Sequence, residues 1–175
     1  MKLYHGTSVE NLISILQGDK NYTRNWIESD PTMMYFYPAT DHKSNDIDRA
    51  RSSACICAAI HKSAHNRIAI IEIDIADDIV ELDSSVELCF NDTVCISYEE
   101  FYKYLQSNTI HIRYYPYKPQ FRSMYLYNAY HNCCTMCWDS IKDQVVDREI
   151  VEKECDRLYE ETGEYENHFK EYLDD

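Results

Sequence analysis

The feature that most constrains this fold is the stretch 67–75, which is apolar on both sides of an extended chain. It reads Arg-Ile-Ala-Ile-Ile-Glu-Ile-Asp-Ile, so isoleucine or alanine occurs at both the even and the odd positions, and therefore on both faces of an extended chain. A strand with one wet face alternates apolar and polar residues, whereas a strand covered on both faces does not. The stretch therefore predicts a central strand of a β-sheet.

The first residues of the chain predict a strand followed directly by a helix. Residues 3–8 read as a short strand that stops at a His-Gly pair, and residues 9–16 have the three-and-four spacing of an amphipathic helix. Ser8 is expected to be the N-cap, because its hydroxyl can accept a hydrogen bond from a free amide of the first turn. Gly18 is expected to end the helix in a left-handed conformation.

Further elements follow from pattern and turn residues along the chain. Ser97 and Glu100 have the spacing of a capping box, which predicts that a helix begins there. The remaining predicted elements are strands at 32–37, 79–82, 93–96 and 109–115, helices at 46–64 and 98–106, and a helical region after residue 121.

Length and composition predict a single cytoplasmic domain. The 175 residues suffice for one core, and no run of about 20 apolar residues predicts a membrane span. The N-terminus has no apolar signal region, so the 8 cysteines are expected to be reduced thiols. The net charge of −14 disfavours non-specific nucleic-acid binding. Residues 147–175 hold 12 acidic and 4 basic residues, which predicts a solvated acidic helix.

Three short motifs occur in an informative order: His5-Gly6-Thr7, then Met34-Tyr35-Phe36, then Lys43-Ser44. A predicted helix and the apolar strand follow them. This arrangement resembles the ADP-ribosyltransferase family, in particular its poly(ADP-ribose) polymerase-like branch, over roughly the first hundred residues. The resemblance implies an α+β fold with a split antiparallel β-sheet flanked by helices. We expect one domain over 1–175, with a catalytic core at 1–120 and a helical acidic extension at 121–175.

The resemblance implies NAD as the substrate and assigns roles to the motif residues. His5 would hydrogen-bond the adenosine ribose, Gly6 would hold the nicotinamide carboxamide through its backbone, and Tyr35 would stack on the nicotinamide ring. Thr7 completes the first motif, and Ser44 resembles the serine that contacts the carboxamide.

Asp92 is the expected catalytic carboxylate. The segment 91–97 resembles the family pattern in which a glutamate precedes a strand, with Asp92 in the glutamate position. Cleavage of the nicotinamide–ribose bond passes through an oxocarbenium-like state, which a carboxylate can stabilise. Aspartate is one methylene shorter, which favours mono-ADP-ribosylation of a protein acceptor over chain extension. Glu99, Glu100 and Gln120 are weaker candidates for the same role.

Two alternative functions remain open at this stage. An RNA 2′-phosphotransferase-like enzyme would need cleft arginines, for which Arg49, Arg51 and Arg67 are available. A protein with the same fold and a weakened triad would instead bind or inhibit a partner. The hypotheses are distinguished by whether His5, Tyr35 and Asp92 converge on one pocket and whether that pocket retains NAD.

Two other clusters have structural explanations that we favour. His131, Cys133, Cys134 and Cys137, with Cys155, have residue types that bind zinc, but they lack a second close pair at a standard spacing. Buried reduced cysteines explain that cluster more simply, so no metal site is expected. The second cluster is a tyrosine-rich, basic region that could bind bases or a protein, although half-buried core tyrosines are more common; it comprises Tyr114, Tyr115, Tyr117, Tyr125, Tyr127 and Tyr130 with Arg113, Lys118 and Arg122.

Overall fold

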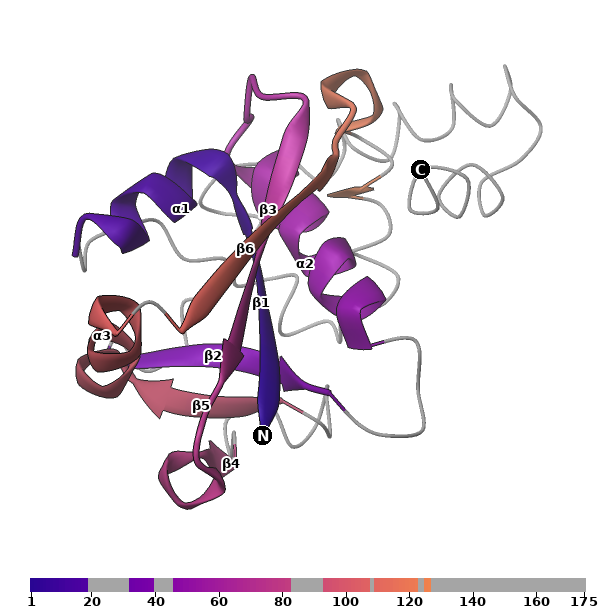
Figure 1. Ribbon diagram of the computed structural model, residues 1–175. Helices are drawn as coiled ribbons and strands as arrows, with labels where there is room; N and C mark the ends of the chain where they lie inside the picture. The colour runs from indigo at the N-terminus through magenta and orange to yellow at the C-terminus, as the bar shows by residue number, and fades with distance from the viewer. Residues whose placement is uncertain (19–31, 40–45, 83–92, 108, 123–124, 127–175) are drawn as a thin grey trace.

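The computed structural model describes residues 1–18, 32–39, 46–82, 93–107, 109–122 and 125–126. Within these ranges the protein is α+β, with one six-stranded antiparallel sheet in the order β4-β5-β2-β1-β3-β6 (Figure 1). The elements are β1 (Lys2–Ser8), α1 (Val9–Leu16), β2 (Met33–Pro38), α2 (Asp46–Ile60), β3 (Arg67–Asp74), η1 (Asp77–Ile79), β4 (Glu81–Leu82), β5 (Val94–Ser97), α3 (Tyr98–Gln106), β6 (Ile110–Pro116) and η3 (Pro119–Phe121).

The apolar stretch forms β3, and its interior place confirms the prediction of a central strand. It lies between β1 and β6, and every residue of β3 except its first and last is buried. Because successive side chains of a strand point to opposite faces, its isoleucines divide between two cores. Ile68 and Ile70 join the core beneath α2, whereas Ile71 and Ile73 join the core on the opposite face, near α1 and α3.

Helix α2 lies close to the sheet because small residues line the contact. Ala50, Ala54 and Ala58 are fully buried against it. A Cβ atom added to Gly6 would lie 1.8 Å from the Ala50 carbonyl oxygen, closer than any real contact. The glycine in β1 therefore admits the helix backbone, and no other residue fits at this position.

Both predicted serine caps are confirmed. The Asn11 amide donates to Ser8 Oγ at 3.2 Å at the start of α1, and the Glu100 amide donates to Ser97 Oγ at 3.2 Å at the start of α3. Gly18 has a φ of 75° and its amide donates to the Ile15 carbonyl, as expected for a helix end.

The predicted strand at 3–8 agrees with β1, which begins at Lys2 and is paired with β3 along its whole length. Two other predicted boundaries were wrong. Helix α2 ends at Ile60 rather than at residue 64, since Lys62 takes a left-handed φ of 51° and the Ser63 amide bonds to the Ala58 carbonyl. The predicted strand at 79–82 is reduced to β4, preceded by a 3₁₀ turn.

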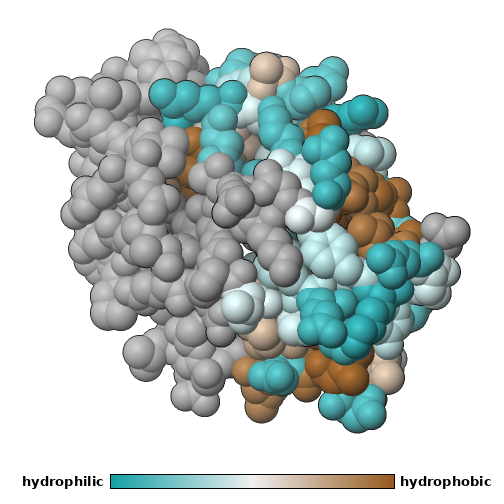
Figure 2. Space-filling view, turned by 90° about the vertical axis from the view of Figure 1, so that its left-hand side faces the viewer, coloured by the Kyte–Doolittle hydropathy of each residue, from teal (hydrophilic) through white to brown (hydrophobic). Residues whose placement is uncertain are grey.

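The described surface is largely hydrophilic in the view of Figure 2, with apolar residues gathered in separate patches. None of the helices in the described ranges is both long and apolar enough to cross a membrane. The predicted acidic helix at 147–175 lies outside the described residues.

Candidate functional site

The candidate site lies where β1 and β2 part. Strand β1 is paired with β3 from Lys2 to Ser8, but its pairing with β2 covers only Leu3 opposite Pro38 and Tyr4 opposite Tyr37. Beyond Tyr4 strand β2 continues its pairing with β5 instead. In Figure 1 β2 and β5 accordingly run across the direction of β1 and β3. The sheet is thus divided into two parts that are joined by a short ladder.

His5 is the first residue of β1 beyond that ladder, and its side chain replaces the missing pairing. Its Nδ1 lies 2.7 Å from the Tyr35 carbonyl oxygen. A carbonyl oxygen can only accept, so Nδ1 carries the hydrogen and a neutral ring presents Nε2 as an acceptor. The ring also contacts the Phe36 ring edge to face, with centroids 5.7 Å apart.

Burial lowers the pKa of His5 below its ordinary value, and the hydrogen bond to Tyr35 opposes that shift only in part. The imidazole is therefore neutral at pH 7. A neutral ring held by one nitrogen can accept a hydrogen bond from a hydroxyl group at the other nitrogen.

His5 meets Tyr35 through the backbone rather than through the phenol ring. Along β2, Met34 and Phe36 are fully buried in the core near α1 and α3, so the alternation of the strand directs the partly buried Tyr35 side chain to the other face. The structure brings the two predicted residues together at the carbonyl of Tyr35, and the two rings leave β1 and β2 in different directions.

Gly6 and Thr7 of the same motif contact α2. The space that a Gly6 side chain would occupy is taken by the Ala50 carbonyl. Thr7 is buried, with its Oγ1 4.0 Å from Cys57 Sγ of α2. On that face of β1, α2 approaches the backbone of Gly6 in the place where a flat ligand was expected.

Asp92 and Ser44 lie outside the described residues. Strand β5, which follows Asp92 after Thr93, is paired with β2, with Val94 opposite Phe36 and Cys95 opposite Tyr35. The strand that the sequence places after the candidate carboxylate is therefore adjacent to the strand that binds His5.

The weaker carboxylate candidates do not lie in a strand. Glu99 and Glu100 are in the first turn of α3, where Lys103 forms ion pairs with both. Glu99 is exposed, as predicted for at least one of them. Gln120 is exposed in η3, so the expectation that it could occupy a late strand was wrong; Pro119 begins a 3₁₀ turn there instead.

The three arginines considered for a phosphotransferase do not converge on one site. Each guanidinium lies over a different tyrosine ring, at 4.4–5.0 Å from the centroid. The pairs are Arg49 with Tyr37, Arg51 with Tyr115, and Arg67 with Tyr114.

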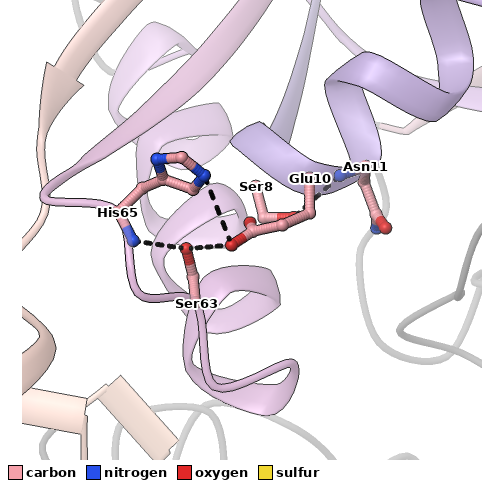
Figure 3. A network of polar contacts seen from close by, with 5 residues as sticks. All are labelled: Ser8, Glu10, Asn11, Ser63 and His65. Carbon is pink, nitrogen blue, oxygen red and sulfur yellow. Dashed lines mark hydrogen bonds and ion pairs between the residues drawn. The ribbon is translucent and has the colours of Figure 1, made fainter.

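No sequence pattern indicated a second polar cluster, which joins the start of α1 to the turn after α2 (Figure 3). Ser63 Oγ donates to Glu10 Oε1 at 2.8 Å, and His65 Nε2 lies 3.8 Å from the same oxygen. The His65 amide donates to Ser63 Oγ at 3.2 Å. In a catalytic triad the histidine lies between the serine and the carboxylate. Here Ser63 and His65 each approach Glu10 directly, so the cluster stabilises the turn and is not a nucleophile–base pair.

No group of three or more histidine, cysteine, aspartate or glutamate side chains in the described ranges is arranged to hold a metal ion. The cluster of His131, Cys133, Cys134, Cys137 and Cys155 lies outside those ranges.

No protein-family model, curated protein or solved structure matches this chain. A functional assignment must therefore rest on its own residues and geometry.

Proposed function

We propose that this protein is an NAD-dependent mono-ADP-ribosyltransferase that transfers ADP-ribose to a protein acceptor and releases nicotinamide. The observation that supports the proposal most is His5 at the parting of β1 and β2, bonded through Nδ1 to the Tyr35 carbonyl. The divided antiparallel sheet agrees with the fold that the sequence motifs imply, and His5 occupies the opening of that sheet.

In this proposal, Nε2 of His5 accepts a hydrogen bond from a ribose hydroxyl of NAD. The bond to Tyr35 fixes the ring orientation before the substrate arrives, which reduces the entropy lost on binding. A neutral imidazole suits this role because only the unprotonated Nε2 can accept.

The carboxylate of Asp92 is proposed to stabilise the oxocarbenium-like ribose as the nicotinamide leaves. The adjacent strands β2 and β5 support this assignment, because they bring the segment after Asp92 next to the strand that carries Tyr35. Tyr35 is proposed to stack on the nicotinamide, with Ser44 at its carboxamide. Gly6 would contribute only its backbone, on the edge toward β2, because α2 fills the face on which a side chain would lie.

The test is binding and turnover of labelled NAD by the full chain and by His5→Gln and Asp92→Asn variants. His5→Gln should weaken NAD binding about ten-fold, because one hydrogen bond in a partly dry site is lost. Asp92→Asn should retain NAD but lose nicotinamide release and label transfer to lysate proteins. His111→Gln, which changes an exposed histidine of β6, is the matched control.

Unchanged NAD affinity in His5→Gln would contradict the assigned role of that residue. Retention of NAD by the wild type without turnover would favour the alternative of a catalytically weak binding protein. If the wild type does not bind NAD, the proposal fails.

A further inference from the structure

The outer edge of β6 is a second feature of the sheet, and it goes beyond the proposed function. The sheet ends at β4 on one side and at β6 on the other. Strand β4 has only 2 residues, whereas β6 has 7 residues from Ile110 to Pro116. Among the described residues, no strand pairs with the side of β6 that faces away from β3. A long unpaired edge is a template for another extended chain, and proteins usually shorten or cover it.

The backbone groups that β6 presents at this edge follow from its register with β3. Antiparallel pairs alternate between pairs that exchange two hydrogen bonds and pairs that exchange none. Just beyond β6, the Tyr117 amide donates to the Asn66 carbonyl at 2.9 Å, so this pair is of the bonded kind. Counting back along the regular register, the residues of β6 that bond to β3 are His111, Arg113 and Tyr115. The residues whose N–H and C=O groups point outward are therefore Ile110, Ile112 and Tyr114.

The two faces of β6 differ in chemistry at this edge. Successive side chains of a strand point to opposite faces. Arg113 lies on the face covered by α2, with Glu72, and its side chain is 54% exposed. Tyr114 lies on the opposite face, where the Arg67 guanidinium covers its ring, and it is 47% exposed. Ile112 shares that face and packs against the core near α1 and α3. One face of the edge is therefore basic, and the other is aromatic and apolar.

The charge at this edge is opposite to that of the whole chain. Strand β6 contains Arg113 and no carboxylate, whereas the net charge of the chain is −14. Glu72, which is 3% exposed, lies 2.8 Å from Arg113 Nη2 and 2.8 Å from Lys2 Nζ. Because two cations already compensate this carboxylate, the exposed Arg113 guanidinium has donors left for a second carboxylate. In the described part of the chain Arg67 forms no ion pair.

We propose that the outer edge of β6 binds an extended acidic segment of a partner protein as an added antiparallel strand. The backbone of that segment would bond to the outward groups of Ile112 and Tyr114. The residue opposite Arg113 would belong to a non-bonded pair of the new ladder, in which side chains lie closest, so a carboxylate there forms an ion pair. A second copy of β6 fits less well, because it has no carboxylate to place beside Arg113.

The experiment follows amide hydrogen exchange of the full chain by NMR, with two short synthetic peptides as probes. In one peptide valine alternates with glutamate, and in the other lysine replaces glutamate. Without peptide, the outward amides of β6 should exchange at least about ten-fold faster than the amides that bond to β3. The valine–glutamate peptide should slow the outward amides, and the valine–lysine peptide should leave them unchanged.

Methylation of the peptide backbone tests the register. In the proposed ladder the N–H groups of the valines point toward β6, and those of the glutamates point away from it. N-methylated valines should therefore abolish the protection of the outward amides. N-methylated glutamates should retain it, since the charge and length of the peptide are the same.

Variants of β6 separate the backbone contribution from the side-chain contribution. Tyr114→Pro removes an outward N–H without removing a bond to β3, and Tyr114→Ala removes the same side chain but keeps the N–H. The affinity for the valine–glutamate peptide, measured by fluorescence anisotropy, should be about ten-fold weaker in Tyr114→Pro than in Tyr114→Ala. Arg113→Gln should weaken binding about five-fold, and this loss should shrink at high salt.

Three outcomes would overturn the proposal. Equal exchange of the outward and inward amides in the free protein would mean that the edge is already covered. Equal affinity for the two peptides, or no binding of either, would remove the acidic partner. Protection that rises with protein concentration alone would make a second copy the occupant. His5→Gln should bind the peptide as the wild type does, because β3 separates β6 from β1 and the NAD site.

Discussion

The two edges of β1 differ in their pairing: one edge is fully paired, and the other is only partly paired and lies at the proposed NAD site. On one edge β3 is paired with β1 from Lys2 to Ser8, and both faces of β3 are covered. On the other edge β2 is paired only at Leu3 and Tyr4, and the polar ring of His5 bonds to β2 instead of the backbone. A strand interior to a sheet normally fills both ladders. An interior edge that does not fill its ladder is thus the first place to look for a ligand.

The largest expected effect tests the close contact between β1 and α2, next to the fully paired edge of β1. Gly6→Ala would place a Cβ 1.8 Å from the Ala50 carbonyl, and backbone cannot rotate away as a side chain can. We expect a loss of about 3 kcal/mol or more in the free energy of unfolding, measured by urea denaturation. Gly18→Ala is the matched control: it has no neighbour within 4 Å but a φ of 75°, and should cost about 1 kcal/mol.

Asparagine separates the two glycines further, because it tolerates a left-handed backbone. Gly18→Asn should be nearly neutral, whereas Gly6→Asn should be at least as damaging as Gly6→Ala. Equal costs for the two alanine variants would mean that α2 does not contact β1 as closely as described.

An intermediate effect tests whether the short ladder lets the two parts of the sheet unfold separately. Ser8→Ala removes the cap of α1, beside the filled edge, and Ser97→Ala removes the cap of α3, beyond the open one. Each should cost about 1 kcal/mol. Leu3, Met34 and Ile96 share one core across both parts, so we expect both substitutions to shift a single global transition equally.

Native-state hydrogen exchange provides the independent measurement for the caps. Ser97→Ala should speed exchange in β1 and β3 as much as in α3. Faster exchange confined to α3 and β5 would show that the open edge is also a boundary between cooperative units.

The smallest effect concerns protonation at the open edge. The pKa of His5 lies below its ordinary value of 6.5 because of burial, and that of His61 is lowered by burial as well. As the pH falls below 6.5, the unfolded chain binds protons at these rings that the folded chain does not, so stability falls; above 6.5 there is no contribution. With His5→Gln or His61→Gln, the unfolding midpoint should fall less steeply than in the wild type as the pH is lowered from 6.5. An unchanged slope in His5→Gln would place the ring in a wetter environment than described.

The sequence predicted the elements well where one local rule decides the structure. The bounds of α1 and α3 agree with the prediction, since in each a serine cap begins an amphipathic run. The central place of β3 followed from its apolar residues on both faces. The end of α2 was not predictable from the sequence, because Lys62 has the left-handed backbone conformation that glycine usually takes at the end of a helix.

The candidate site was predictable only in part, because it depends on contacts between distant segments. The motif marked His5 and Tyr35, but no pattern indicates that the ring of one would bind the carbonyl of the other, 30 positions away. Gly6 was expected to admit a flat ligand, and its absent side chain instead admits α2.

The buried cysteines give the protein built-in reporters of opening. Cys55 and Cys57 lie on α2, and Cys95 lies on β5 beyond the open edge; all three side chains are buried. Burial raises the pKa of Cys55 to about 12. Alkylation of Cys55 is therefore slow for two reasons: the reagent cannot reach the buried thiol, and the thiol stays protonated. Pulsed alkylation followed by peptide mass analysis would therefore time the exposure of each part of the sheet with no label added to the chain.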